Sequence, residues 1–442
     1  MSNSALRTDA LACHAAALVA VDPHALVAGC LARDGSALVL RDRQGRALAR
    51  HDGPALLVGA GKASLGMIEA AADAARPRLM GGLVIVPHGG EGRSVSGVEI
   101  ATGGHPLPDV AGEAATRRLL ERVSGVGGDV LILVLLSGGG SALLVAPAPG
   151  ITLDDKRALT EVLLASGADI AALNTARKHC SRVKGGGLAR AAKHGAGLWA
   201  LLLSDVVGDD PALIASGPTV ADPTTFRDAK RVLEEHLAPD QVPPAVRAHM
   251  ARGLVGDVPE TVKPGDPVLE DVRTLILAGN RDAVAAAARV AAARGYTAEV
   301  LSTPLAGDAA AAGRMLAGRL RAAPRDRPVA LIAGGEATVR VRPGGRGGRS
   351  QQLALAAAIA LAGEPGVVLA AGTDGVDGPT TAAGACVDGD STARARAAGF
   401  DPERALAATD SNPLLAATGD LLLTGPTGTN VADVVVALRG AY

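Results

Sequence analysis

The first residues that could do chemistry form a glycine loop with one lysine, from Val58 to Ser64. The loop follows an apolar run and precedes an Ala-rich helical pattern. Glycine permits a tight turn, and free N–H groups at the start of a helix can hold an anion. We therefore expect Lys62 to act in an active site and Gly59 and Gly61 to contact phosphate. A solvated lysine at a helix start is the alternative interpretation.

Two well-known phosphate motifs do not fit this loop. A P-loop requires Ser or Thr after its Lys and Gly five residues before it, but Ala63 and Leu57 occupy those positions. A dinucleotide fingerprint requires Gly at position 64 and an acidic residue at the end of the next strand. The chain has Ser64 and the sequence Val86-Pro87-His88 instead.

A second glycine loop, Ser137-Gly138-Gly139-Gly140-Ser141, directly follows the apolar run 130–136. Three consecutive glycines remove every Cβ from the path of a ligand and expose successive N–H groups. We predict that all five residues bind phosphate. A sharp structural turn, which needs only one glycine, is the alternative.

Basic residues are concentrated between residues 174 and 188, before another glycine triplet. Charge runs on helices are usually solvated faces, and this interpretation is preferred for Lys178 and Arg182. Arg177 is instead expected to bind the substrate, and Lys184 is expected to bind phosphate. His105, in the loop Gly103 to Asp109, is also predicted to bind the substrate.

Carboxylates end several apolar runs. Asp205 follows a run of leucines, where it could hold a metal or orient a hydroxyl group, although Asp also caps and turns chains routinely. Glu336 follows Gly334-Gly335, and Asp374 and Asp377 flank a glycine turn that lacks the terminal Glu of an EF-hand. We predict that Asp205, Glu336, Asp374 and Asp377 are ligands of Mg²⁺ beside nucleotide phosphates.

The segment GGRGGRSQQ, residues 344–352, opens a long Ala/Leu helix. Its Arg346 and Arg349 provide cationic forks for phosphate or carboxylate oxygens. An exposed hairpin tip is the alternative. Together the loops supply anion donors, a lysine, arginines and carboxylates, without an activated thiol or a nucleophile elbow. Phosphoryl transfer requires this inventory, since its catalysis is mostly positioning and charge neutralisation.

Composition excludes several other classes of function. Lys and Arg number 44 against 45 Asp and Glu, a net charge of -1, and the aromatic residues are only one Trp, two Tyr and two Phe. Nucleic-acid binding is therefore not expected. The four cysteines form no C-x-x-C pair, which argues against a zinc site and a disulfide framework. No apolar stretch reaches membrane-spanning length, and the N-terminus lacks a signal-peptide pattern. We expect a cytoplasmic protein.

The elements that must position these loops follow a βαβ rhythm. Short aliphatic runs, each ending in Gly, Asp or Ser, alternate with Ala/Leu-rich helical patterns. Continuous apolar strands are typical of a parallel sheet covered on both faces, so we predict a three-layer α/β fold with ligand loops at the carboxyl ends of the strands. The Pro-rich stretch 237–271 is the predicted linker, and TLILAGN is expected to start a second sheet. The predicted domains are 1–263 and 264–442.

The ordered motifs GAGKAS, GGHPLPD, LLSGGGSALL, NTARKHCSRVKGGGLA, LLSDVVGDDPALIASGPT, GGEATV, GRSQQLAL, AAGTDGVDGPT and LLLTGPTGTNVAD resemble the glycerate 2-kinase family with a C-terminal MOFRL domain. The resemblance runs from about residue 10 to the C-terminus. It implies a Rossmann-like, doubly wound N-terminal domain, a smaller three-layer α/β MOFRL domain and a site in the cleft between them. It also implies phosphorylation of D-glycerate to 2-phosphoglycerate, with ATP and Mg²⁺.

The resemblance assigns the family's catalytic lysine to Lys62 and its motif arginine to Arg349. Two departures stand out. The family usually has GRNQE where this chain has Ser350 and Gln352, and often has TNVND where this chain has Ala432. Loss of the Glu charge at position 352 puts a metal or base role there in doubt, but activity is expected to survive.

The predicted mechanism uses Mg²⁺ on the ATP phosphates, Lys62 and Arg349 on the transferring group, and Asp205 on the glycerate hydroxyl, with Arg349 also binding substrate. The expected partners are glycerate and ATP, and the protein is expected to be a monomer or homodimer. One alternative is a hydroxypyruvate or tartronate semialdehyde reductase. The other is a non-catalytic metabolite-binding protein, which only the departures at Ser350 and Gln352 support.

Overall fold

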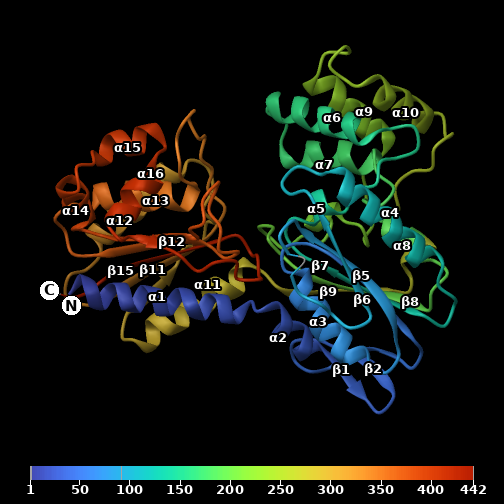
Figure 1. Cartoon of the computed structure of the whole chain (residues 1–442), viewed down its shortest axis with the longest axis horizontal. Coiled ribbons are helices and arrows are strands. Elements are labelled where there is room, and N and C mark those ends of the chain that lie inside the picture. Colours follow the sequence, from blue (N-terminus) through green and yellow to red (C-terminus); the bar gives the residue numbers. More distant parts are fainter. Residues whose placement is uncertain (1, 91, 442) are drawn as a thin grey trace. The chain divides into compact units, whose positions relative to one another are not determined.

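Two six-stranded sheets organise the chain, and the computed structural model, which describes residues 2–90 and 92–441, assigns them to separate units (Figure 1). Unit 2 comprises Pro23–Leu277. Unit 1 comprises the residues up to Asp22 together with those from Ala278 onward. Both sheets carry helices, which confirms the predicted α/β class.

The large sheet of unit 2 has the strand order β6-β5-β4-β7-β8-β9. Its strands are β4 (Ala55–Ala60), β5 (Leu79–Pro87), β6 (Val98–Gly103), β7 (Leu131–Leu136), β8 (Gly197–Leu203) and β9 (Val272–Ala278). The pairs β6–β5, β5–β4, β4–β7 and β7–β8 are parallel. A separate antiparallel sheet contains β1 (Leu31–Asp34), β2 (Ala37–Arg41) and β3 (Ala47–His51). The strands β4 and β7 are buried along their whole length, as the continuous apolar runs predicted.

Unit 2 also contains α2 (Pro23–Cys30), α3 (Ser64–Ala75), α4 (Val110–Ser124), α5 (Gly140–Leu143), α6 (Leu153–Ala165), α7 (Ile170–His179), α8 (Gly187–Ala191), α9 (Phe226–His236) and α10 (Pro244–Leu254), with 3-10 turns η1 (Ile214–Ser216) and η2 (Pro267–Leu269). Helices α6, α7, α9 and α10 form a layer above the sheet in Figure 1. Their buried side chains form a separate core. Side-chain caps fix the starts of α6, α7 and α9, as where Thr152 and Asp155 form a capping box on α6.

The predicted linker 237–271 is wrong. It contains α10, whose Val246 and Met250 belong to the buried core of the helical layer with Phe226. The prolines there start a helix, because Pro244 occupies its first turn, where its missing N–H is no loss. The segment TLILAGN likewise starts no second sheet, since it runs through β9, an edge strand of unit 2.

The sheet of unit 1 has the order β10-β11-β15-β12-β13-β14. Its strands are β10 (Thr297–Val300), β11 (Val329–Gly335), β12 (Val367–Gly372), β13 (Gly384–Asp388), β14 (Leu421–Leu422) and β15 (Asp433–Arg439). Its helices are α1 (Asn3–Ala20), α11 (Asn280–Ala293), α12 (Ala309–Ala322), α13 (Arg349–Ala360), α14 (Ser391–Ala397), α15 (Pro402–Ala408) and α16 (Ser411–Ala417). The β10–β11 pair is parallel, but β15 runs antiparallel to both β11 and β12. A parallel sheet is therefore wrong for this unit, because burial on both faces makes strands continuously apolar in either direction.

Helix α1 belongs to unit 1 although it begins the chain. Arg7 forms ion pairs with Asp388 and Asp420 at 2.7 and 2.8 Å. Two residues later, Asp9 accepts a hydrogen bond from Tyr296 at 2.7 Å. The units therefore divide after Asp22 and after Leu277, which differs from the expected division after residue 263.

Of the helices that the structure describes, none taken singly has both the length and the apolar character to cross a membrane, whereas α1 and α2 together meet these criteria across a break between them.

Candidate active site

The two predicted glycine loops of unit 2 interlock at the carboxyl ends of β4 and β7. The backbone N–H of Lys62 donates to the carbonyl oxygen of Gly138 at 2.9 Å, and that of Ala63 donates to Oγ of Ser137 at 2.9 Å. A Cβ at Gly61, where φ is +140°, would lie 2.1 Å from Oγ of Ser137. Glycine is therefore required for this close approach. The prediction that the loops meet at one edge of the sheet is confirmed.

Two of the predicted phosphate contacts are corrected by this packing. Gly59 lies inside β4, where it pairs with Val84 and Leu135, so neighbouring strands enclose its backbone. Ser137 is fully buried, and its hydroxyl joins the two loops. Both residues support the loops and do not face a ligand.

Gly139 forms the floor of the candidate site. A methyl group at this position would lie 3.0 Å from Cδ2 of His105 and 3.4 Å from Cγ of Lys62, so both side chains pass over it. Within the described chain, the backbone N–H groups of Gly138 and Gly139 make no hydrogen bond. Two amide donors, an imidazole and a lysine therefore converge, which is the arrangement of an oxyanion or phosphate site.

The loop that carries His105 is held by Asp109. This carboxylate caps α4 by accepting from the N–H of Gly112 at 2.8 Å, and it also lies 2.6 Å from Nε2 of His88. Burial raises the pKa of Asp109, but the hydrogen bonds from Gly112 and His88 outweigh it, and the net pKa is lowered. The anchored Asp109 therefore stays ionised and fixes the end of the loop.

A hydrogen-bonded chain that sequence reasoning missed lies beside Ser141. The hydroxyl of Ser216 donates to Oδ1 of Asn174 at 3.1 Å, and the hydroxyls of Ser216 and Ser141 lie 2.8 Å apart. Since Ser216 has only one proton, Ser141 must be the donor in the second bond. Ala215 and Ser216 both have positive φ angles, 50° and 61°, which non-glycine residues rarely adopt. The only sequence signal for Asn174 and Ser216 was their position within two of the motifs that carry the family resemblance.

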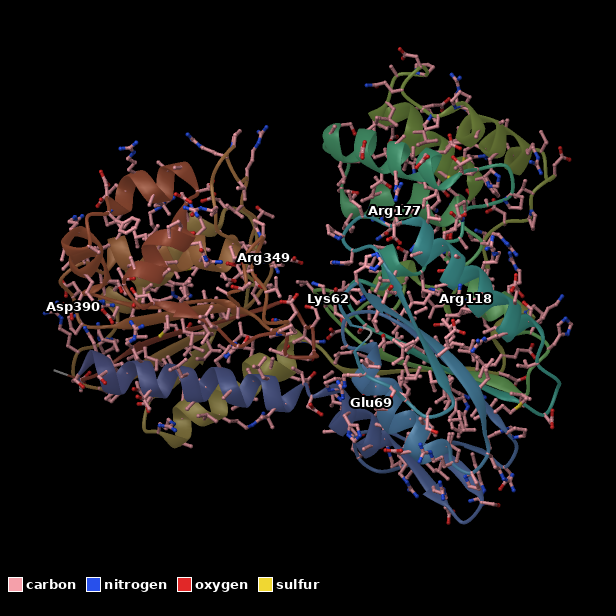
Figure 2. The ribbon with its side chains drawn as sticks, in the orientation of Figure 1. Lys62, Glu69, Arg118, Arg177, Arg349 and Asp390 are labelled. Atoms are coloured by element: carbon pink, nitrogen blue, oxygen red, sulfur yellow. The ribbon has the colours of Figure 1, made fainter. Side chains whose placement is uncertain are left out.

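Three cations gather next to this hydrogen-bonded chain, and none of them forms an ion pair with a carboxylate among the described residues. The ammonium of Lys184 donates to the carbonyl oxygen of Ser141 at 2.8 Å, and that of Lys156 donates to the carbonyl oxygen of Cys180 at 2.9 Å. The guanidinium of Arg177 has no hydrogen bond or ion pair with any described residue. Figure 2 shows Arg177 on α7, above Lys62 in unit 2.

The pKa values reflect this crowding. Burial, followed by the charges of Lys156 and Arg177, lowers the pKa of Lys184 well below its usual value. Burial also lowers the pKa of Lys156 to about 8 and lowers that of Arg177. An anion bound here would offset both the burial and the mutual repulsion.

Asp205 follows β8, which is the neighbour of β7 in the parallel sheet. Leu202 pairs with Leu136, so the chain after β8 leaves the sheet at the same edge as the loop Ser137 to Ser141. Its carboxylate is therefore on the expected edge of unit 2.

In unit 1, Arg349 is compensated by carboxylates. Its Nε and Nη2 donate to the two oxygens of Asp433 at 2.6 and 2.9 Å, and its Nη1 lies 2.8 Å from Oε1 of Glu336. Burial lowers the pKa of Arg349, but the hydrogen bond and charge of Asp433 outweigh it, and the net pKa is raised. Burial raises the pKa of Asp433 to about 6, although Arg349 opposes the shift. Glu336 and Arg349 line a surface hollow of about 370 Å³.

The antiparallel direction of β15 creates this pair. Asp433 is the first residue of β15 and pairs with Gly335, at the end of β11, and with Gly372, at the end of β12. The start of one strand thus meets the ends of its two neighbours. Asp433 was missed because a parallel sheet would have put it at the opposite edge; a carboxylate opening the apolar run VVVAL was the available signal.

The predicted metal ligands are divided between the units, with Asp205 in unit 2 and Glu336, Asp374 and Asp377 in unit 1. Nowhere among residues 2–90 and 92–441 do three or more His, Cys, Asp or Glu side chains come together in a way that could hold a metal. Asp377 is buried and accepts from the backbone N–H groups of Ser350 and Gln351 at 3.1 and 2.8 Å. It anchors the start of α13, which corrects its prediction as a ligand. Asp374 accepts from the N–H of Val376 at 3.1 Å, as an Asx turn does.

Ser350 and Gln352, the two residues near Arg349 that depart from the family motif, are buried. The side-chain amide of Gln352 donates to the carbonyl oxygen of Leu406 at 2.6 Å, and the side chain is buried. Ser350 is also buried and contributes its backbone N–H to Asp377. A glutamate at position 352 could not donate this hydrogen bond while ionised, so Gln fits its surroundings here.

Comparison with known proteins identifies the family of this chain. Residues 9–251 match a domain of unknown function (DUF4147), and residues 329–433 match the MOFRL family. The chain is 38% identical to a glycerate 2-kinase from Pyrococcus horikoshii, over 96% of this chain and 94% of that one. It is 43% identical to a putative hydroxypyruvate reductase from Agrobacterium vitis, over 88% of each.

Solved structures agree with the sequence relatives. A crystal structure of glycerate kinase (EC 2.7.1.31) from Thermotoga maritima matches with a TM-score of 0.83 at 36% identity, over 99% of this chain and 100% of that one. Identity of this level over nearly the whole length extends the likeness beyond the fold. The chain therefore belongs to the glycerate kinase family, in which a DUF4147 domain is followed by a MOFRL domain.

Proposed function

We propose that this protein is an ATP-dependent kinase that phosphorylates D-glycerate to 2-phosphoglycerate. Membership of the glycerate kinase family supports phosphoryl transfer to glycerate. The observation that carries the proposal is the floor at Gly139, where Lys62 and His105 pass over two backbone amides that make no hydrogen bond. Such donors suit the oxygens of a transferring phosphate.

In the proposed reaction, the 2-hydroxyl oxygen of glycerate forms a bond to the γ-phosphorus of ATP, the bond to the β–γ bridging oxygen breaks, and ADP leaves. Lys62 and the amides of Gly138 and Gly139 neutralise charge on the phosphate oxygens. Asp205 orients the hydroxyl and accepts its proton, while His105 contacts the substrate. These roles require positioning rather than a covalent intermediate.

Arg177 and Lys184 are proposed to hold anionic groups beside Ser141, Arg177 on the substrate and Lys184 on a phosphate. Lys156 and Lys184 are buried and Arg177 is half-buried, and among the described residues none of them has a carboxylate partner. A bound carboxylate or phosphate would therefore relieve their repulsion. Gly140 and Gly61 shape the loops that approach these groups.

Arg349 is proposed to stabilise the transferring group. A guanidinium has five N–H donors. Asp433 accepts from two of those of Arg349, and Glu336 forms an ion pair with Nη1. One donor on each terminal nitrogen is left for a substrate oxygen. Asp433 thus acts as a positioning residue that fixes the plane of the guanidinium.

Mg²⁺ would enter with the ATP phosphates, since it usually takes one or two carboxylates plus phosphate oxygens and water. The half-exposed Asp374 and Asp205 and the exposed Glu336 are the carboxylates that could contribute. When bound, the ion would neutralise charge on the phosphate oxygens.

The test is ³¹P NMR of purified protein with ATP, MgCl₂ and D-glycerate. The expected result is a 2-phosphoglycerate resonance that is absent without protein. The variant Lys62→Ala is expected to lose at least a hundredfold in kcat with unchanged far-UV circular dichroism, whereas the control Lys193→Ala, an exposed lysine of the same unit, keeps its rate. A 3-phosphoglycerate signal would reject the position of transfer, and equal rates for Lys62→Ala would reject the role of Lys62.

A reductase is the rival that the name of the Agrobacterium relative suggests. The strand after the Lys62 loop is β5, which ends at Pro87 and is followed by His88, so the strand does not end in the acidic residue that binds a nicotinamide ribose. NADH oxidation with hydroxypyruvate, measured at 340 nm, would establish the rival. We expect none.

A non-catalytic metabolite sensor is the second rival. Its support was Ser350 and Gln352, and both are buried in contacts within unit 1. Binding of glycerate without turnover would identify a sensor. We further propose a cytosolic monomer or homodimer; the four free, buried cysteines suit a reducing compartment.

A further inference from the structure

A second pocket lies within the helical layer of unit 2. Its volume is about 300 Å³, at the lower end of the usual range for small-molecule sites. It is bounded by the end of α7, the turn after it, the start of α9, helix α10 and the loop that follows α10. None of the residues of the loops 58–64 and 137–141 lines it, so its walls are separate from the floor at Gly139.

The pocket is strongly basic in a chain whose net charge is -1. Five cationic side chains line it: Lys178, Arg182, Lys184, Arg190 and Arg252. The lining carboxylates are Asp257 and Glu260, and Lys178 is paired at 3.5 Å with the buried Asp222, which does not line the pocket. The cations therefore exceed these carboxylates by two when His179 and His249 are neutral.

One of the two carboxylates is already engaged. Glu260 lies 3.2 Å from Nε2 of His179 and 3.1 Å from the ammonium of Lys263, and it accepts from the N–H of Phe226 at 2.9 Å. Burial raises its pKa, but these contacts outweigh it and the net pKa is lowered. Glu260 therefore remains an ionised structural partner and does not neutralise the arginines.

The cations differ in depth. Lys178 and Lys184 are 6% and 3% exposed, whereas Arg182 and Arg252 are exposed. In the described chain, no hydrogen bond or ion pair engages the guanidinium of Arg182 or of Arg252. Lys178 is paired with Asp222, so the cations that remain available to a ligand of this pocket are the two guanidinium groups at its rim, which bind phosphate by charge-assisted hydrogen bonds.

An unused acceptor lies in the same wall. Nε2 of His249 lies 2.9 Å from the carbonyl oxygen of His179, and burial lowers the pKa of His249, so the neutral ring donates from Nε2. Its buried Nδ1 is then an acceptor without a partner in the described chain. A hydroxyl group on a bound phosphorylated ligand could donate a hydrogen bond to this nitrogen.

We propose that this pocket binds a small phosphorylated metabolite at a site separate from the floor at Gly139. Lys184 connects the two regions, since its ammonium lines the pocket and donates to the carbonyl oxygen of Ser141. An occupant of the pocket is therefore one hydrogen bond away from the Ser137 to Ser141 loop.

The test is isothermal titration of the full chain with inorganic phosphate, at low ionic strength and with a saturating non-hydrolysable ATP analogue. We expect binding to persist with the analogue, and the double variant Arg182→Gln/Arg252→Gln to weaken it at least tenfold. The matched control is Arg227→Gln, an exposed arginine on α9 that does not line the pocket and has no ion pair in the described chain. The phosphate affinity of this control variant should stay within twofold of that of the wild type.

Two outcomes would overturn the proposal. Phosphate binding that the ATP analogue abolishes, with a raised KM for ATP in the double variant, would make the pocket part of the nucleotide site. Equal affinity in the double variant and wild type would mean that these arginines bind no phosphate. The titration needs no turnover, so a failure of the proposed kinase activity is recorded separately by the NMR assay.

Discussion

The cations of unit 2 and the arginine of unit 1 represent two ways of keeping positive charge in a folded protein. Lys156, Arg177 and Lys184 are crowded together, their hydrogen bonds go to carbonyl oxygens, and their pKa values are lowered. Arg349 is held by Asp433 and Glu336, and its pKa is raised. The first arrangement stores repulsion that an anion relieves, whereas the second fixes one geometry before any ligand arrives.

The largest effect is expected from Arg349→Ala. It leaves Asp433, which is 4% exposed, without its counter-charge, and breaking a buried pair in this way costs about 3 kcal/mol. Thermal unfolding should therefore shift down, and Arg349→Ala/Asp433→Asn should recover most of the loss. If the double variant is no more stable than the single one, the charge of Asp433 is not what the arginine compensates.

The cation cluster should respond to pH through Lys156, whose pKa in the fold is about 8 against 10.5 unfolded. The unfolded chain then binds more protons between these values, so this group destabilises the fold below pH 8 and stability rises from about pH 8 to 10.5. The variant Lys156→Met should lack this rise, which is on the order of 2 kcal/mol. The measurement is thermal unfolding of the wild type and of Lys156→Met from pH 7.5 to 10. If the stability of the two proteins changes with pH in the same way, the prediction is contradicted.

Removal of an uncompensated cation should harm binding more than stability. We expect Lys184→Met to weaken ATP binding at least tenfold, about 1.4 kcal/mol, with a change in unfolding free energy below about 1 kcal/mol, since its charge has no carboxylate partner. Titration calorimetry and thermal unfolding measure the two quantities. The exposed Lys193→Met is the control, and a stability loss like that of Arg349→Ala would erase the contrast between the two regions.

The smallest effect concerns the residue before Asp433. Ala432 has φ of +66°, a conformation that costs an L-residue about 1 kcal/mol or more. Its carbonyl oxygen accepts from the hydroxyl of Thr373 at 2.6 Å, so the turn is fixed. Ala432→Gly should therefore stabilise the protein by about 1 kcal/mol in denaturant unfolding without a change in KM. Lower stability would mean that the turn tolerates alanine without strain.

Sequence patterns predicted the α/β class, and they predicted that the Lys62 loop and the Ser137 to Ser141 loop meet. Both predictions rest on a local rule: strands that run parallel deliver their following loops to one edge. The same rule failed for Asp433, because the direction of β15 depends on its pairing partners, which are far away in the sequence. Continuous apolar runs do not encode strand direction.

The missed network of Ser216 and Asn174 has a different cause. It depends on positive φ angles at Ala215 and Ser216, which no pattern of residue types predicts. The prediction of a linker at 237–271 failed because proline can either start a helix or interrupt one. Only the packing partners of Val246 and Met250 in the helical layer distinguish these two roles. In both cases the deciding contacts come from distant segments.

The membership of α1 in unit 1 has a consequence for the protein's synthesis. The helix leaves the ribosome before unit 2, but α11, against which it packs most extensively, follows roughly 260 residues later. At translation rates of about 5–20 residues per second, this delay is about 13–52 s, during which unit 2 is synthesised. The apolar face around Leu6, Ala10 and Cys13 must wait uncovered for that time. Throughout the synthesis of unit 2, the nascent chain therefore exposes α1 to aggregation and to chaperones.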